Sequence, residues 1–325
     1  MRYNPLGNSD IKVSEISLGC WTMGGLNWVN GNPNGWADPD EEAITAAIKR
    51  AVDAGVNHFD NADVYGNGHA ERMLARVLSR LGLKSEDFVI ATKTGHFPGT
   101  AAHGYEPAHI RHQCEQSLIN LKRDYVDIYY FHHGDFGAEG EYLDDAVATI
   151  NSLVEEGKVR LKGQSAYSDA HFERAIPAVR PTVVQSWANM DAPNFIAGGG
   201  VVPGLLEEYG CSFVAFSPLG QGRLLGKYSA DNPPSFEDGD HRKGSKAFSA
   251  EGLRALEPKV QALKERFGDS TEALSAVCQR FVLDHPRVAC VIPGFRNEQQ
   301  VNCNLAADGF SLSEEDMAFI RSLFR

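Results

Sequence analysis

The stretch VNHFDNADVYGNGHAERMLARVLSR, residues 56–80, contains one strand–turn–helix unit. The short apolar run Val56–Asp60 predicts a strand, and the glycine-rich residues after it predict a turn. Apolar side chains then recur at helical spacing over His69–Arg80, which predicts an amphipathic helix. An acid at the end of the strand, followed by Tyr65 in the loop, favours a proton-handling site over simple packing.

Similar units repeat along almost the whole chain, and their strand-like runs are apolar nearly throughout, as in strands buried on both faces. The competing fold, a doubly wound open sheet, would need a glycine-rich phosphate turn after the first strand, but residues 18–28, LGCWTMGGLNW, lack GxGxxG. The pattern therefore predicts an α/β fold, a (β/α)8 TIM barrel forming a single domain over residues 1–325. The expected strands are Val13–Leu18, Val56–Asp60, Phe88–Lys93, Val126–His132, Val159–Ser165, Thr182–Gln185, Ser212–Ser217 and Val288–Ile292.

Three segments interrupt this rhythm. Met1–Ile11 predicts an N-terminal hairpin that turns at Gly7-Asn8 and closes the barrel bottom, and Asn297–Ala306 and Ser313–Phe324 predict extra C-terminal helices. The polar, proline-rich Ser229–Ala250 is either a mobile loop on the functional face or solvated surface. The helices expected between strands are one capped by Asp40, His69–Arg80, one opened by Pro107, one marked by Leu143 to Val154, and others from Ser168, Pro203 and Thr271.

Composition excludes some classes of partner. The formal net charge of −12 argues against nucleic acid and anionic membranes as partners. The N-terminal MRYNPLGNSD has no apolar core of a signal peptide, and no stretch approaches the length of a membrane span, so we expect a cytoplasmic protein. The sequence does not decide whether the protein is a monomer or a homo-oligomer. Six scattered cysteines without CxxC spacing predict buried, reduced thiols: Cys20, Cys114, Cys211, Cys278, Cys290 and Cys303.

Three chemically useful side chains close neighbouring strands. Asp60, Lys93 and His132 each stand where an apolar run ends, and adjacent strands lie about 4.8 Å apart. These groups and Tyr65 therefore converge at the end of the barrel where active sites form. We expect Lys93 to lower the pKa of the Tyr65 phenol, Asp60 to hold Lys93, and His132 to polarise a substrate oxygen.

Each of these residues also has a structural alternative. Asp60 would only cap its turn, Lys93 would be a surface lysine with a buried stem, and His132 would satisfy loop carbonyls. Their joint position at three successive strand ends favours the catalytic interpretation.

Seven motifs occur in order along nearly the whole chain: FDNADVYGNGHAE (59–71), IATKTG (90–95), DYVDIYYFHHG (124–134), GKVRLKGQSAYS (157–168), VVQSWANM (183–190), FSPLGQGRLLGKY (216–228) and VIPGFRNEQQVNCNL (291–305). By these motifs the chain resembles the aldo-keto reductase superfamily, and most of all the bacterial branch that includes sugar and polyol reductases and potassium-channel β subunits. The resemblance implies hydride transfer between NADP(H) and a carbonyl or alcohol carbon, without metal. The implied catalytic set is Asp60, Tyr65, Lys93 and His132, with Tyr65 as acid/base. No side chain supplies a hydride, so a cofactor is required.

The resemblance also implies a cofactor cradle. Ser165 and Gln185 match the positions that bind the nicotinamide carboxamide, and Phe216 matches the aromatic residue that stacks on the ring. Arg296 would face the adenosine 2′-phosphate at the start of a helix, where anions are favoured. The other implied cofactor residues are Trp21, Ser217, Leu219, Gln221 and Gly222, with Gln300 and Asn304 on the adenine side.

Two departures from the family pattern bear on cofactor binding. Ala166 follows Ser165 where the family commonly has Asn, so one carboxamide contact is lost or comes from another group. Only Arg296 offers a clear cation for the 2′-phosphate, with Lys227 and Arg223 as helpers. NADP is therefore favoured, and NAD remains an alternative.

Substrate selection is expected in the loops Cys20–Pro39, His133–Tyr142 and Phe195–Val202. Aromatic and amide side chains near Trp21 and Trp28 suit a sugar-like ring, unless the Asn and Gly residues of that loop only make turns. We expect His133 to add a polar contact. Three functions fit: a carbonyl reductase for a polar or sugar substrate, an NAD(P)+-dependent sugar dehydrogenase, and a non-catalytic nucleotide-sensing subunit.

Overall fold

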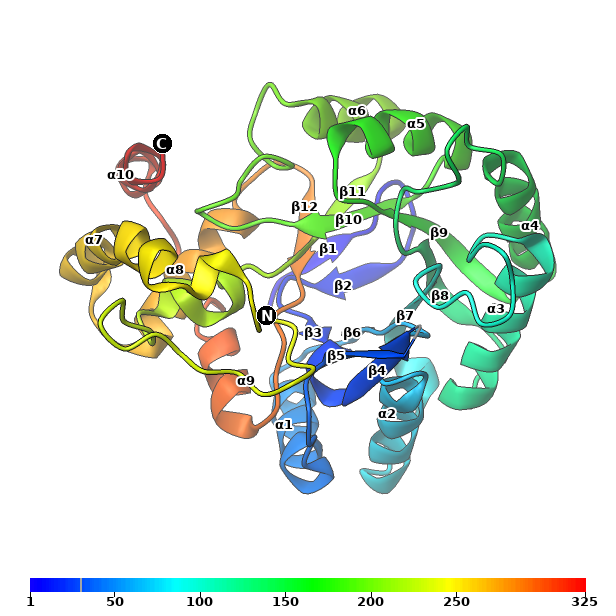
Figure 1. The fold of residues 1–325 in the computed structure, drawn as a ribbon, viewed down its shortest axis with the longest axis horizontal. Coiled ribbons are helices and arrows are strands. Elements are labelled where there is room, and N and C mark those ends of the chain that lie inside the picture. Colours follow the sequence, from blue (N-terminus) through cyan, green and yellow to red (C-terminus); the bar gives the residue numbers. More distant parts are fainter. Residues whose placement is uncertain (30) are drawn as a thin grey trace.

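The computed structural model describes residues 1–29 and 31–325, and its centre is an eight-stranded parallel barrel (Figure 1). The barrel closes where β12 returns to the first strand, because Val291 pairs with Ile16 and Gly294 with Gly19, both in parallel. The predicted barrel is confirmed. Its strands are β3 (Leu18–Gly19), β6 (His58–Asp60), β7 (Val89–Thr94), β8 (Val126–Phe131), β9 (Val159–Ser165), β10 (Val183–Trp187), β11 (Ser212–Phe216) and β12 (Val288–Val291).

Alternate residues of each strand fill the barrel interior. Val89 and Ala91 of β7 pack with Ile128 and Tyr130 of β8 in one buried cluster. Because side chains alternate between the two faces of a strand, the next inward position on β7 is Lys93. The catalytic candidates are thus the last interior layer, at the carboxyl ends of the strands.

The helices form the outer layer around this barrel (Figure 1). Asp40 caps the first helix as predicted, since its carboxylate accepts hydrogen bonds from the backbone N–H groups of Glu42 and Ala43. One helix, α7, was missed because Pro258 interrupts its pattern. The helices are α1 (Glu41–Asp53), α2 (His69–Arg80), α3 (Pro107–Leu121), α4 (Leu143–Glu155), α5 (Asp169–Val179), α6 (Val201–Tyr209), α7 (Ala250–Phe267), α8 (Thr271–Leu283), α9 (Glu298–Leu305) and α10 (Glu314–Leu323). None of the helices in residues 1–29 and 31–325 is long and apolar enough to cross a membrane.

An N-terminal hairpin plugs the bottom of the barrel. It pairs β1 (Tyr3–Pro5) with β2 (Lys12–Ser14), and Leu6, Ile11 and Val13 join the interior cluster. The predicted strand Val13–Leu18 is therefore wrong as one unit: its first residues belong to the plug, and only β3 belongs to the barrel. The split follows from pairing, because Val13 pairs with Asn4 in the plug whereas Leu18 pairs with Phe59 of β6.

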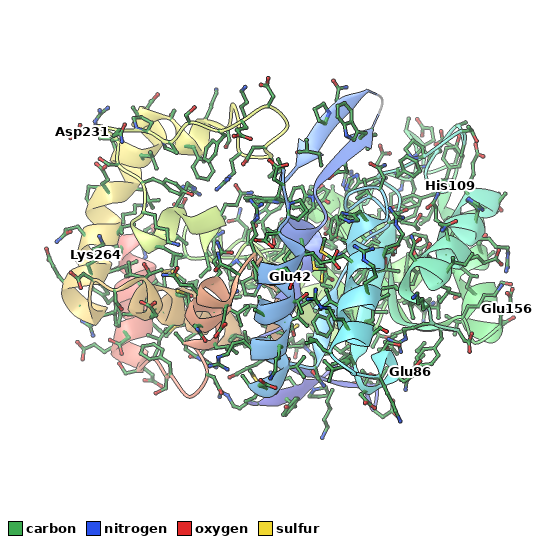
Figure 2. The ribbon with its side chains drawn as sticks, turned by 90° about the horizontal axis from the view of Figure 1, so that it is seen from below. Glu42, Glu86, His109, Glu156, Asp231 and Lys264 are labelled. Atoms are coloured by element: carbon green, nitrogen blue, oxygen red, sulfur yellow. The ribbon has the colours of Figure 1, made fainter. Side chains whose placement is uncertain are left out.

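Two segments cover the opposite end. The hairpin of β4 (Leu26–Val29) and β5 (Asn32–Gly35) was not predicted. The segment after β11 reaches it: Gly35 N–H donates to the carbonyl of Gly239 at 2.9 Å, and His241 N–H donates to Gly35 at 3.0 Å. Figure 2 shows this hairpin and the region of Asp231 at the same end of the barrel, opposite Glu86. We call residues 20–39 and 229–249 the roof; Asn30, expected in the substrate loop, lies outside the described residues.

Candidate active site

A buried ion pair forms the base of the site. The ammonium of Lys93, at the end of β7, contacts the carboxylate of Asp60, at the end of β6, and both side chains are almost fully buried. Lys93 also donates to the carbonyl of Asn61 at 2.7 Å. The second oxygen of Asp60 accepts a hydrogen bond from the Gln185 amide at 2.8 Å. A buried charge needs such partners, and this pair has them on both sides.

Tyr65 lies directly beside this pair. Its hydroxyl is 3.3 Å from Lys93 Nζ, so the two groups are brought together as predicted from the sequence. The loop that carries Tyr65 packs very closely on residues 20–25: a Cβ on Gly66 would lie 1.9 Å from the carbonyl oxygen of Gly24. Only glycine fits there, and this close approach lays the Trp21 ring over Tyr65, with centroids 5.8 Å apart.

The environment of Tyr65 keeps its proton on. Burial, and then the negative charge of Asp60, raise the pKa of the phenol well above its usual value. The prediction that Lys93 lowers this pKa is therefore wrong. The ammonium of Lys93 contacts the carboxylate of Asp60 and donates to the Asn61 carbonyl. Its positive charge is balanced by these groups and does not offset the cost of burying a phenolate. Tyr65 is consequently a protonated donor at neutral pH.

His132 follows β8 and completes the predicted set. Its ring lies edge-on to Tyr65, with centroids 5.8 Å apart. Burial, then the nearby His96 and Lys93, lower its pKa well below the usual range, so the imidazole is neutral. Its Nδ1 is buried without a hydrogen-bond partner among the described residues. Since an orphaned N–H is rarer than an orphaned lone pair, the proton belongs on Nε2.

The residues expected to hold a nicotinamide lie around this centre. Ser165, the last residue of β9, pairs with Gln185 in the middle of β10, and both are buried. Phe216 pairs with Trp187 at the end of β11, and their rings are 6.3 Å apart. Gln185 differs from the expectation in one respect: its amide N–H is already committed to Asp60. The carbonyl oxygen and the second N–H of the amide are not part of that bond.

The loop after β11 has an unusual backbone. Ser217, Gln221 and Gly222 all have positive φ, at 54°, 56° and 89°. Leu219 precedes the short 3-10 helix Gly220–Leu225 that contains two of them. The N–H groups of Gly220 and Gly222 close turns on the carbonyls of Ser217 and Leu219, at 3.0 and 2.9 Å. The pyrophosphate role that the resemblance implied for these residues stays a prediction.

Arg296 lies at the other end of the expected cofactor path. Its guanidinium donates to the carbonyls of Ala37 and Asp38 at 2.7 and 2.6 Å, and no carboxylate pairs with it in the described part of the chain. Its backbone N–H donates to Gln300 at 2.7 Å, and Asn304 donates to the carbonyl of Gly294 at 3.2 Å. Arg296 therefore ties the roof to the start of α9 while keeping an uncompensated positive charge.

The three predicted substrate residues are placed differently from one another. Trp21 covers Tyr65, and its indole N–H donates to the buried Asn27 at 3.3 Å. Trp28 is 56% exposed on the outer hairpin, away from this contact. His133 packs against His96, with ring centroids 4.8 Å apart, and lies one residue beyond the catalytic candidate His132. Of the three, only Trp21 has a ring contact with Tyr65.

Sequence reasoning missed several residues of this site. His96 lies 4.4 Å from His132 between ring centroids, and Tyr167 hydrogen-bonds to it. His241 of the roof lies 4.5 Å from Trp21. The first two carried a readable signal, because His96 comes three residues after Lys93 and Tyr167 two residues after Ser165, the last residue of β9. No local pattern points to His241.

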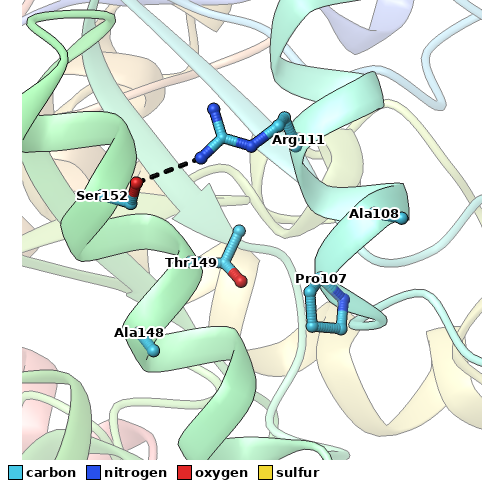
Figure 3. A pocket seen from close by; sticks show the side chains of 6 residues that line it. All are labelled: Pro107, Ala108, Arg111, Ala148, Thr149 and Ser152. Atoms are coloured by element: carbon cyan, nitrogen blue, oxygen red, sulfur yellow. Dashed lines mark hydrogen bonds between the residues drawn. The ribbon is translucent and has the colours of Figure 1, made fainter.

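Other hollows in the molecule lie outside this site. Figure 3 shows a pocket of about 360 Å³ between α3 and α4, lined by Pro107, Thr149 and Arg111 among others. Its one charged group is already paired, since Arg111 donates to Ser152 and to Glu156. We assign it no chemistry. The described residues contain no group of three or more His, Cys, Asp or Glu that could hold a metal ion.

Comparison with known proteins places this geometry in context. The profile of the Aldo/keto reductase family matches residues 15–325. A probable voltage-gated potassium channel subunit beta from Arabidopsis thaliana is 30% identical over 318 residues, covering 94% of this chain and 91% of its own length. An L-glyceraldehyde 3-phosphate reductase from Escherichia coli strain K12 is 26% identical over 339 residues, covering 98% of this chain and 91% of its own length.

Solved structures show the same architecture. A glycerol dehydrogenase from Gluconobacter oxydans superposes with a TM-score of 0.80 at 25% identity, covering 99% of this chain and 94% of its own. An aldo-keto reductase from Bacillus halodurans, in its holo form, superposes with a TM-score of 0.74 at 22% identity, covering 100% of this chain and 97% of its own.

Proposed function

Because the chain belongs to the aldo/keto reductase family, we propose that it is an NADP(H)-dependent oxidoreductase acting on the carbonyl or alcohol group of a polar, sugar-like small molecule. The observation that carries this proposal is the contact of the Tyr65 hydroxyl with Lys93 Nζ at 3.3 Å, beside the Lys93–Asp60 pair. A phenol in contact with a buried ammonium is suited to proton transfer.

The residues divide the work as follows. Tyr65 gives its proton to the carbonyl oxygen as that oxygen gains negative charge, and Lys93 stabilises the phenolate that remains. Neutral His132 donates a hydrogen bond from Nε2 to the same oxygen and orients it. Asp60 keeps Lys93 charged and in place. A bound nicotinamide would supply or accept the hydride, which no side chain can do.

The chain fits such a cofactor. The positive-φ residues after β11 are the proposed contacts of the pyrophosphate. Within the described residues, the guanidinium of Arg296 bonds only to the backbone carbonyls of Ala37 and Asp38, which carry no charge. A phosphate dianion would bind Arg296 more strongly than those carbonyls do. This argument supports NADP over NAD.

The alternative direction, an NAD(P)+-dependent sugar dehydrogenase, would use the same residues. It requires Tyr65 to lose its proton before the alcohol reacts, and the raised pKa of the phenol opposes that step. Reduction is therefore the favoured direction.

A non-catalytic nucleotide-sensing subunit is the second candidate, and the similarity to the Arabidopsis thaliana channel subunit supports it. Against it stands the complete set of Asp60, Tyr65, Lys93 and His132 at the strand ends.

The deciding experiment follows NADPH consumption by the wild type and by Tyr65→Phe over a panel of aldehydes and sugars. We expect turnover by the wild type and a loss of roughly a thousandfold in the variant, with cofactor binding retained. Tyr129→Phe is the matched control, since the Tyr129 hydroxyl donates to Ile110 in α3, outside the barrel interior. Nucleotide binding by the wild type without turnover on any substrate would favour the sensing subunit.

A further inference from the structure

His96 is a polar side chain that packs against His132. It follows β7 and is half-buried. Its ring centroid lies 4.4 Å from that of His132 and 4.8 Å from that of His133. No role has so far been assigned to it.

The hydrogen bonds of Tyr167 determine which nitrogen of His96 carries the proton. The Tyr167 hydroxyl donates to the backbone carbonyl of His132 at 3.2 Å. A hydroxyl has one proton and a carbonyl cannot donate, so Tyr167 must accept its other bond, at 2.9 Å, from Nε2 of His96. Burial, His133 and Lys93 lower the pKa of His96 to about 4, which keeps the ring neutral. The second nitrogen, Nδ1, is therefore a lone-pair acceptor.

This acceptor is free to bind a ligand. No donor from the described chain bonds to Nδ1 of His96, whereas Nε2 is held by Tyr167. Beside it, Tyr65 and Nε2 of His132 are donors for one substrate oxygen. The site thus offers two donors for a carbonyl oxygen and, one imidazole away, an acceptor for a second group that must carry a proton.

We propose that Nδ1 of His96 accepts a hydrogen bond from a hydroxyl on the carbon next to the substrate carbonyl, which makes His96 a specificity-determining residue for α-hydroxyaldehydes and α-hydroxyketones. This inference rests on the carbonyl reductase function proposed above. The hydroxyl of such a substrate lies one carbon from the reacting centre, which matches the adjacency of the His96 and His132 rings. A ketone or aldehyde without the hydroxyl leaves the acceptor unpaired, and sites built for a hydroxyl discriminate against analogues that lack it.

The test compares kcat/KM for pairs of substrates that differ by this hydroxyl alone: lactaldehyde against propanal, and glycolaldehyde against acetaldehyde. We expect the wild type to prefer the hydroxylated member by roughly ten- to hundredfold. His96→Phe should bring the ratio close to one, because the hydroxyl of lactaldehyde loses its acceptor. Tyr167→Phe should weaken the preference partly, because it releases Nε2. His96→Asn, which retains an acceptor, should restore part of it.

His103→Phe is the control for a merely structural effect. The His103 ring stacks on Tyr142 at 4.2 Å and lies behind His133, so its loss should leave the substrate ratio unchanged. An equal kcat/KM for lactaldehyde and propanal in the wild type, or a preference that survives in His96→Phe, would overturn the proposal.

A binding measurement separates this inference from the proposed activity. Trp21 covers Tyr65, so quenching of protein fluorescence by each aldehyde reports binding without turnover. If no substrate is reduced, the carbonyl reductase function fails. The His96 assignment then stands if lactaldehyde binds more tightly than propanal and His96→Phe removes the difference, and it falls if the two bind equally.

Discussion

Two buried ion pairs occupy the two ends of the barrel, and they differ in what they leave free. At the bottom, Arg280 of α8 donates to both oxygens of Glu15, at 3.1 and 2.8 Å, and to the Ala307 carbonyl at 2.9 Å. At the mouth, Lys93 contacts Asp60 but also lies 3.3 Å from a hydroxyl that has its own chemistry. Both pairs are almost wholly buried.

The difference shows that a buried ion pair can serve two purposes in this molecule. The guanidinium of Arg280 donates to both oxygens of Glu15 and also contacts Asp284 at 3.4 Å, which holds the N-terminal segment against α8. The compact ammonium of Lys93 leaves room for Tyr65 and stabilises charge that develops there. Changes at the bottom should therefore affect stability, and changes at the mouth should affect turnover.

The largest expected effect is on turnover at the mouth. Lys93→Met should reduce the rate of carbonyl reduction by roughly a thousandfold or more, because it removes the charge that stabilises the Tyr65 phenolate. Lys162→Met is the matched control: Lys162 of β9 donates to Asn151 at 2.8 Å and should change the rate less than about twofold. Steady-state kinetics with NADPH measure both. Substantial activity in Lys93→Met would show that the ion pair at the barrel mouth is not needed for turnover.

The second effect is on stability at the bottom. Arg280→Met should lower the free energy of unfolding by roughly 1–3 kcal/mol, since the buried Glu15 loses its buried partner and keeps only the mostly exposed Arg2, at 2.9 Å. Urea denaturation measures this free energy. We expect Arg280→Met to remain active at low temperature, where it stays folded. Arg266→Met, which breaks exposed contacts to Glu315 and Asp316, should cost less than about 1 kcal/mol. Equal losses in the two variants would contradict the distinction between buried and exposed pairs.

Arg296 is a third cation to compare with Lys93 and Arg280. Within the described residues its guanidinium binds backbone carbonyls and no carboxylate. Arg296→Gln should raise the Kd of NADPH by roughly ten- to hundredfold and that of NADH much less, since only NADPH carries the 2′-phosphate. Nucleotide titrations followed by fluorescence measure this change. If Lys227→Gln rather than Arg296→Gln removes the discrimination, the phosphate site lies at Lys227.

The smallest effect concerns pH. The pKa of His132 is lowered, so the ring stays neutral above about pH 6, and the pKa of Tyr65 is raised, so the phenol stays protonated up to about pH 8 and beyond. The rate of reduction should change less than about twofold across this range, whereas oxidation of an alcohol should accelerate as pH rises. Rate profiles in both directions provide the measurement. A reduction rate that falls steeply from about pH 6 to about pH 8 would show that the phenol loses its proton there.

Much of this site was predictable from local sequence. Lys93 and His132 end apolar runs, and strand periodicity alone puts Lys93 inside the barrel next to Asp60. The expected helices with clear caps were found, as at Asp40 and at Ser313, where a capping box is present. The six cysteines are buried, as predicted.

Two features of the site that sequence reasoning did not give depend on contacts between distant segments. The pKa of Tyr65 depends on burial beneath Trp21, which follows from a loop contact between Gly24 and Gly66. Which nitrogen of His96 keeps its lone pair depends on the hydrogen bond from Tyr167 to the His132 carbonyl, which joins the segments that follow two different strands.

What the sequence determined by itself was the barrel and the residues at its strand ends, because periodicity and burial act over a few neighbouring positions. Only the tertiary structure decided the proton positions, the roof and the partner of each buried charge. These properties depend on contacts between segments far apart in the chain, such as His241 with Trp21 and Arg296 with Ala37, whose energies no local pattern encodes.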